Sequence, residues 1–134
     1  MGNSVRFGVS LPEDLLEKFD GKIEREMYAN RSEAVRDLIR ESLTEERLEN
    51  PDAEAVGTLT LIYDHGKRGI SDKLTDLQHE ELPHVISSMH VHLDEHNCME
   101  VLALRGKAGE IQETADRLSN TKGVEHGELA IKAV

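Results

Sequence analysis

One amphipathic strand pattern at the start of the chain constrains the fold more than any other feature. In VRFGVSL, residues 5–11, apolar side chains alternate with polar or small ones, which is the period of a half-buried β-strand. The patterns that follow are helical, so residues 1–48 offer no second strand to pair with it. A lone strand leaves its backbone groups unpaired, and so short a segment makes too small a core. We therefore expect this unit to dimerise through a two-stranded antiparallel ribbon.

Two helices are predicted after the strand. The first begins near Pro12, a residue that suits the first helical position. The second opens at NRSE, residues 30–33, which has the form of a capping box with Asn30 as N-cap and Glu33 at the third helical position. Apolar residues at helical spacing form the two inward stripes: Leu15, Leu16, Phe19 and Ile23 in the first helix, and Ala34, Val35, Leu38, Ile39 and Leu43 in the second.

The outward face of the predicted ribbon carries Arg6, Gly8 and Ser10. A two-stranded ribbon fits the DNA major groove, where such side chains read base edges. A helical hairpin that only dimerises is the alternative, because two polar residues on a solvated strand are ordinary. Gly8 presents no side chain, so direct base contacts would rest on Arg6 and Ser10.

Residues 5–46 resemble the ribbon-helix-helix family of DNA-binding proteins. The resemblance implies that the start of the second helix holds a DNA phosphate through its free backbone amides, at Asn30, Arg31 and Ser32. Met27 departs from the family pattern, because it stands where the turn between the helices often carries glycine. This substitution predicts local strain without a change of fold.

The distributions of charged residues and of histidines change near residue 50, which divides the chain into two parts. Residues 1–48 hold 8 Lys and Arg against 11 Asp and Glu, whereas residues 49–134 hold 8 against 16 and all seven histidines. The polar stretch between these parts predicts a DNA-binding domain over 1–48, a linker over 49–54 and a second domain over 55–134. The net charge of −11 argues against a general nucleic-acid coat protein but permits a small positive face. No apolar run is long enough for a membrane span, and we expect a cytoplasmic protein.

The second part of the chain has the pattern β-α-β-β-α-β. Strand, helix, strand, strand, helix and strand are predicted in that order over residues 57–65, 71–82, 85–93, 98–106, 108–120 and 124–134. This order is the ferredoxin-like arrangement. The predicted fold class is therefore α+β, with a ribbon-helix-helix unit before a ferredoxin-like domain.

The stretch HVHLDEHNC, residues 90–98, contains the only cysteine of the chain. His90 and His92 are two apart on a strand, so both rings project from one face, about 6.5 to 7 Å apart along the chain. Cys98 begins the next strand after a short turn, which returns its side chain beside them. Imidazole with thiolate suits zinc, copper or nickel rather than magnesium or calcium.

The alternative for this stretch is a histidine pair in the core beside a chance cysteine, which the acidic DEHN turn disfavours. A fourth ligand is left open among the remaining histidines: His65, His79, His84, His96 and His126.

Four segments together, NRSEAVRDLIR, LQHE, HVHLDEHNC and GVEHG, resemble the nickel-responsive transcriptional regulator family, NikR, across essentially the whole chain. The resemblance implies an ACT-type ferredoxin-like domain, a homotetramer built as a dimer of dimers, and a double-stranded DNA operator as partner. It places one Ni(II) per subunit at subunit interfaces, on His90, His92 and Cys98 of one subunit and His79 of a neighbour. Three imidazoles and one thiolate in a plane suit Ni(II) or Cu(II). The implied output is repression of nickel-uptake genes.

The same resemblance implies supporting residues. Side chains near the metal orient the ligands or respond to the ion: Gln78, Glu100, Tyr63 and His65. Basic residues of the second domain can touch DNA phosphates: Lys67, Arg68 and Lys122. Two acids can hold a hard cation between the domains, although they equally fit as a capping residue and a first-turn acid: Glu33 and Asp37.

Three rival functions remain to be weighed against a regulator. A metal-dependent hydrolase needs an open metal position and a general base, and four protein ligands would close the site. An amino-acid-sensing repressor would bind its effector without metal. An antitoxin needs only the first domain, and the structured region over 55–134 disfavours it. We therefore expect no enzyme.

Overall fold

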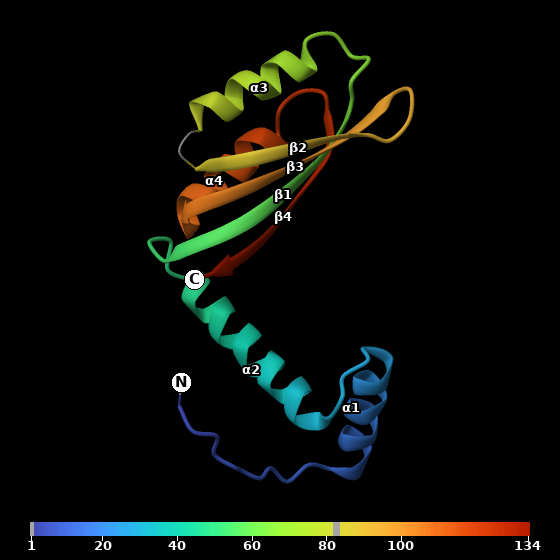
Figure 1. The fold of residues 1–134 in the computed structure, drawn as a ribbon, viewed down its shortest axis with the longest axis vertical. Coiled ribbons are helices and arrows are strands. Elements are labelled where there is room, and N and C mark those ends of the chain that lie inside the picture. Colours follow the sequence, from blue (N-terminus) through green and yellow to red (C-terminus); the bar gives the residue numbers. More distant parts are fainter. Residues whose placement is uncertain (1, 82–83) are drawn as a thin grey trace. The chain divides into compact units, whose positions relative to one another are not determined.

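The structure is a computed structural model, and it describes residues 2–81 and 84–134. Two helices precede a four-stranded sheet that carries two further helices (Figure 1). Internal contacts divide the chain into unit 1, Met1–Ser42, and unit 2, Leu43–Val134. No helix in the described residues is long and apolar enough to cross a membrane. The functional boundaries at 48 and 55 remain a prediction.

Unit 1 contains helix α1, Glu13–Arg25, and most of helix α2, Arg31–Leu48. Pro12 is the N-cap of α1, so the helix begins one residue later than predicted. The Glu33 amide donates a hydrogen bond of 2.9 Å to Asn30 Oδ1. This bond confirms Asn30 as the N-cap of α2, because a side-chain oxygen here satisfies one of the amides that a helix start leaves free.

The turn between α1 and α2 depends on a left-handed residue. The Tyr28 amide donates to the Ile23 carbonyl and the Met27 amide to the Glu24 carbonyl, each at 3.1 Å, which is the Schellman pattern of a helix end. The residue after the cap must then have positive φ, and Met27 has φ 63°. The predicted strain at this position is therefore present, since a side chain disfavours this backbone conformation.

The segment before α1 has no regular secondary structure in the single chain, and residues 2–12 are exposed. The predicted strand is therefore not formed here, because one chain offers it no partner strand. Ile23 and Ala34 are buried in unit 1, whereas the rest of the predicted stripes is half-buried or exposed. Unit 1 thus leaves much of its apolar surface uncovered, and pairing with a second copy remains the prediction that would cover it.

Unit 2 confirms the predicted β-α-β-β-α-β order. Its elements are β1, Glu54–Asp64; α3, Ile70–Glu80; β2, Val85–His92; β3, Asn97–Lys107; α4, Ala108–Ser119; and β4, Val124–Ala133. The strand order is β2-β3-β1-β4, and every pairing is antiparallel. This is the ferredoxin-like sheet, with β2 and β4 at its edges.

One face of the sheet packs against both helices of unit 2. Along β1 the alternate residues Leu59, Leu61 and Tyr63 are buried, as the period of a strand requires. They form one core with residues of α3 and α4, including Leu74 and Ile111. The same face of β2 and β3 carries the candidate ligands, so the core helices lie on the side of the sheet where the ligands project.

The expected linker lies within unit 2 and is hydrogen-bonded to the start of α4. The carbonyls of Pro51 and Ala53 accept bonds of 2.8 Å from the amides of Gly109 and Ala108, which are among the free amides at the start of α4. A Cβ on Gly109 would lie 3.0 Å from the Pro51 Cβ, so a side chain there would require Pro51 to move by a few tenths of an ångström. Residues 51–53 therefore cap α4 rather than run free through solvent.

Candidate metal centre

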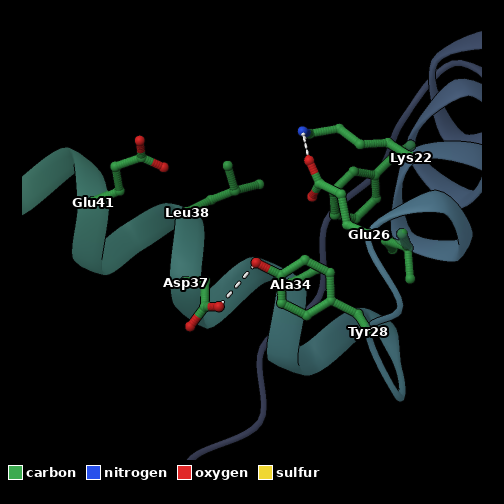
Figure 2. Close-up of a pocket in the computed structure, with 9 residues that line it drawn as sticks. Lys22, Glu26, Tyr28, Ala34, Asp37, Leu38 and Glu41 are labelled. Carbon is green, nitrogen blue, oxygen red and sulfur yellow. Dashed lines mark hydrogen bonds and ion pairs between the residues drawn. The ribbon is translucent and has the colours of Figure 1, made fainter. Parts of the chain in front are cut away.

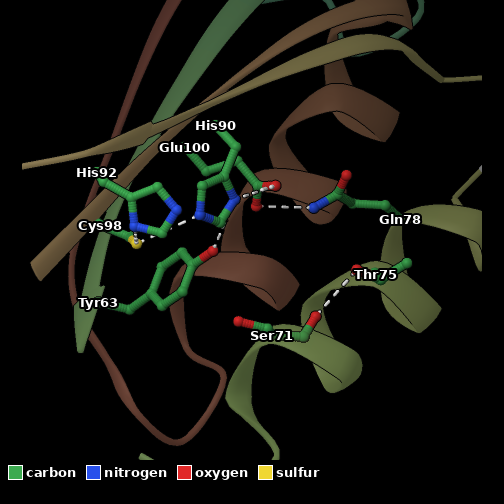
Figure 3. A network of polar contacts seen from close by, with 8 residues as sticks. All are labelled: Tyr63, Ser71, Thr75, Gln78, His90, His92, Cys98 and Glu100. Carbon is green, nitrogen blue, oxygen red and sulfur yellow. Dashed lines mark hydrogen bonds and ion pairs between the residues drawn. The ribbon is translucent and has the colours of Figure 1, made fainter. Parts of the chain in front are cut away.

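The register of β2 against β3 brings three predicted ligands together. His92 lies opposite Cys98, and His90 lies opposite Glu100. The Cys98 Sγ is 3.2 Å from His90 Nε2 and 3.4 Å from His92 Nδ1, with the sulfur next to both rings (Figure 3). The two imidazole centroids are 5.1 Å apart. A two-residue spacing on an edge strand and a four-residue turn are sufficient to produce this arrangement.

The surroundings of Cys98 favour a protonated thiol in the absence of a cation. Its side chain is fully buried. Burial raises the pKa of the Cys98 thiol, and the carboxylates of Glu100, Asp64 and Asp94 raise it further. A thiolate is the form that ligates metals, so a bound cation would have to supply the charge that stabilises it.

His65 adds a fourth donor to the same corner of the sheet. It follows β1, and β1 pairs with β3 so that Tyr63 lies opposite Cys98. Ligating atoms of His65, His92 and Cys98 all lie within 4.8 Å of one another. His65 Nε2 is buried and makes no hydrogen bond, although buried polar atoms are normally paired. A histidine with an unpaired ring nitrogen, in a cluster with a second histidine and a thiol, fits a nitrogen- and sulfur-preferring divalent ion, so the residues present fit nickel.

Polar side chains surround Nδ1 of His90, the ring nitrogen that does not face Cys98. The Tyr63 hydroxyl oxygen lies 3.2 Å from His90 Nδ1, and Glu100 Oε1 lies 3.7 Å from it. Gln78 Nε2 donates to Glu100 Oε2 at 2.9 Å, which extends the network to α3 (Figure 3). Burial, followed by the Glu100 charge, raises the pKa of Tyr63 to about 12, so its hydroxyl stays protonated. These contacts hold Nδ1 and leave Nε2 facing the sulfur.

His79 lies apart from this cluster. It is near the end of α3 and exposed, and among the described residues the clustered metal-ligating side chains are His65, His92 and Cys98. His84 lies 3.5 Å from Glu110 through its Nε2, and His126 is an exposed residue of β4. Within one chain, therefore, His65 is the competitor that approaches the site, and the assignment of His79 to a neighbour's site remains a prediction.

Sequence reasoning missed the part played by Asp94 in the β2–β3 turn. Its Oδ1 accepts bonds of 2.8 Å from the amides of His96 and Asn97, and its Oδ2 accepts one of 3.0 Å from the Asn97 side chain. The Asn97 contacts lower the pKa of Asp94 to about 2. An Asp two residues before free amides is a known turn pattern, so DEHN contained the signal. This turn determines where Cys98 lies relative to His92.

The predicted DNA contacts are exposed and belong to both units. Arg6, Gly8 and Ser10 are in the N-terminal segment, and Lys67, Arg68 and Lys122 are in loops of unit 2. Ser32 is exposed at the start of α2, whereas the Arg31 guanidinium makes two bonds of 2.8 Å to the Asp20 carboxylate. The Arg31 side chain is therefore already engaged, although a phosphate would use its backbone amide.

The two acids predicted to hold a hard cation differ in their surroundings. Asp37 accepts a 2.9 Å bond from the Tyr28 hydroxyl and lines a cavity of about 360 Å³ between α1 and α2 (Figure 2). Glu33 does not line it. Among the described residues neither acid belongs to a cluster of metal-ligating groups, and the hard-cation site remains a prediction.

Comparison with known proteins matches both parts of the chain. Residues 56–132 match the NikR C-terminal nickel-binding domain, and residues 5–46 match the ribbon-helix-helix proteins of the CopG family. A protein of Geobacter sulfurreducens named as a nickel-responsive regulator is 58% identical over 98% of this chain and 94% of its own length. Another with that name, from Pyrococcus furiosus, is 52% identical over 95% of this chain and 92% of its own. A solved ACT domain of the GTP pyrophosphokinase from Chlorobium tepidum covers 57% of this chain and 99% of that domain, at 12% identity and a TM-score of 0.49.

Proposed function

Because the chain belongs to the family of nickel-responsive transcriptional regulators, we propose that it represses nickel-uptake genes when Ni(II) is bound. Members of this family join a ribbon-helix-helix DNA-binding domain to a nickel-binding regulatory domain, so the chain is a regulator and not an enzyme. The proposed active form is a cytoplasmic homotetramer, a dimer of dimers, with one nickel ion per subunit at subunit interfaces.

The observation that carries the proposal is the cluster around Cys98. Two imidazole nitrogens lie within 3.4 Å of one buried sulfur. His90 and His92 are on β2, an edge strand, so a second copy of the chain has access to this edge of the sheet. The proposed fourth ligand is His79 of a neighbouring subunit, since His79 is exposed and absent from its own chain's cluster.

The contacts around His90 suggest how nickel binding could affect the position of α3. A bound nickel ion supplies the positive charge that makes the Cys98 thiolate stable. Tyr63 and Glu100 hold Nδ1 of His90, and Gln78 joins Glu100 to α3, the helix that carries His79. A site completed by His79 would therefore order α3 of one subunit against its neighbour. Nickel can raise DNA affinity only as far as it binds the DNA-competent arrangement more tightly than the other arrangements. This coupling free energy is typically about 1 to 3 kcal/mol.

DNA recognition is assigned to the N-terminal ribbon of a dimer. Arg6 and Ser10 would contact base edges, and the amides at the start of α2 would hold a phosphate. The exposed apolar residues Val5, Phe7 and Val9 favour pairing of two copies, because the ribbon would bury them. The basic side chains of Lys67, Arg68 and Lys122 would add phosphate contacts from the regulatory domain.

The experiment is a DNA-binding titration of the metal-free protein with Ni(II), Cu(II), Zn(II) and Co(II) in turn. The probe is DNA from upstream of nickel-transport genes, with random DNA of equal length as control, at fixed salt because phosphate contacts make affinity salt-dependent. We expect nickel to raise affinity for the probe by about tenfold or more and affinity for random DNA far less. Equal probe affinity with and without every metal would overturn the proposal. An added arm with amino acids in chelator-treated buffer tests the amino-acid-sensing alternative.

A further inference from the structure

The end of α3 is fixed by a buried carboxylate outside the metal centre. Glu81, the C-cap of α3, is 7% exposed. Its Oε2 accepts a 2.8 Å bond from the Thr114 hydroxyl, and its Oε1 is paired with the Arg117 guanidinium. Both partners are on α4, and Thr114 is itself buried. A carboxylate removed from water is stable only with such partners, so Glu81 holds the end of α3 against α4.

A second polar contact holds the same end of α3 from the sheet side. Gln78 donates to Glu100, whose other oxygen faces His90 (Figure 3). Ile70 and Leu74 are the buried apolar residues of α3, and both precede Gln78. Apolar packing therefore holds the helix through these two residues, with the half-buried Leu77 also against the core, and Gln78 and Glu81 add polar contacts that fix its last turn.

These two contacts determine where His79 points. Successive residues of an α-helix are rotated by about 100°, so Gln78 and Glu81, three apart, lie only about 60° from each other. Both face inward, and His79 is rotated away from both. Fixing Gln78 on the sheet and Glu81 on α4 thus sets the rotation of the last turn and presents His79 to solvent.

We propose that Glu81 is a positioning residue for metal binding, which acts through His79. Its contacts with Thr114 and Arg117 fix the last turn of α3 in the orientation that offers the His79 imidazole to a neighbouring subunit. The inference rests on the proposed function, because it needs His79 to be a ligand of the neighbour's site. It assigns a role to α4, which otherwise only covers the sheet.

Glu81→Gln in the full-length protein tests the inference, with Glu80→Gln as matched control because Glu80 is adjacent and exposed. Nickel affinity is measured by competition with a chelator, and amide hydrogen exchange is followed in the metal-free protein. We expect Glu81→Gln to bind nickel about tenfold more weakly, as loss of an orienting partner typically does. Exchange should rise over residues 77–80, the last turn of α3, and stay unchanged in β3, and Glu80→Gln should match the parent in both measurements.

The same substitution in a His79→Ala background separates positioning from a general structural effect. If Glu81 acts through His79, Glu81→Gln then has no further effect on nickel affinity. An equal loss in both backgrounds overturns the inference, as does unchanged affinity in Glu81→Gln alone. If Glu81→Gln does not fold, Arg117→Gln replaces it, since Arg117 is half exposed, and the same outcomes apply. If His79→Ala alone leaves nickel affinity unchanged, the proposed ligand set fails, a result distinct from the failure of Glu81.

Discussion

Burial and nearby negative charge favour the protonated thiol of Cys98 until a cation is bound. The thiol is fully buried, and the three carboxylates that raise its pKa all lie around the metal centre. The sequence predicted its approach to His90 and His92, because strand period and turn length are local properties. The proximity of His65 follows from the pairing of β1 with β3, a long-range register that the spacing of residues does not contain.

Cys98→Ser should abolish the thiolate-to-nickel charge-transfer absorption and most nickel-dependent DNA binding. The reason is that Cys98 is the only thiol of the chain, and a serine hydroxyl does not ionise near neutral pH. Absorption spectra of the nickel-loaded proteins and the DNA titration above measure these effects. His126→Ala, a change at an exposed histidine of β4, is the control and should leave both intact. An unchanged spectrum for Cys98→Ser would remove Cys98 from the site.

Met27→Gly should stabilise unit 1 by about 1 kcal/mol, the typical cost of a left-handed residue with a side chain. Met27 has φ 63° and is 89% exposed, so glycine relieves strain and loses almost no packing. The midpoint of urea unfolding of the metal-free protein measures the gain. Met27→Ala keeps the Cβ and should gain almost nothing, and an equal gain from alanine would show that the backbone at this position is not strained.

At the scale of elements, local signals predicted most of the fold. Apolar periodicity placed all six elements of unit 2, and the capping residue Asn30 placed the start of α2. The N-terminal strand is the exception, because a strand exists only through pairing and residues 2–12 have no partner in one chain. The Glu81 contact was also beyond local reasoning, since α3 and α4 are separated by two strands in the sequence.

The β2–β3 turn should stabilise the metal-free protein in a pH-dependent way. The folded pKa of Asp94, about 2, is below its ordinary value near 3.8, so its contribution is complete above pH 4 and is lost as the pH falls toward 2. Asp94→Asn removes the charge but keeps an acceptor oxygen. The unfolding free energies of parent and variant should therefore differ at pH 6 and converge near pH 2. A difference that does not change with pH would show that the charge of Asp94 is not what stabilises the turn.

Arg6→Ala should remove sequence-specific DNA binding and leave nickel affinity near that of the parent. A major-groove arginine contact is worth about 1 to 3 kcal/mol of discrimination and occurs twice in a symmetric dimer. Competition between operator and random DNA at fixed nickel and salt measures the loss. Arg40→Ala, which changes an exposed arginine of α2, provides a charge-matched control. If Arg6→Ala still discriminates operator from random DNA, the ribbon is not the reading element.

At the scale of the whole molecule, one chain has incomplete surfaces in both units. Unit 1 leaves Phe7 and Leu38 exposed, and unit 2 holds three clustered ligands beside an edge strand while His79 faces solvent. Pairing with other copies of the chain is the proposal that would complete both surfaces. Sequence patterns indicate which residues of such surfaces are apolar or can bind metal, but they do not show how copies of the chain would be arranged around these surfaces. The subunit arrangement therefore needs a test of its own.

Mixed tetramers test whether the ligand set is divided between subunits. A His79→Ala chain still offers His90, His92 and Cys98, and a His90→Ala chain still offers His79. If the site is shared, tetramers containing both chains regain some complete four-ligand sites, which neither variant has alone. Nickel titration of the mixed tetramers, whose composition is verified by mass, should then show a fraction of sites with affinity close to that of the parent.

A site within one subunit predicts no recovery, because each chain then carries its own defect. Mixed tetramers that bind nickel no better than the separate variants would end the cross-subunit mechanism, and with it the role proposed for Glu81 in presenting His79 to a neighbour.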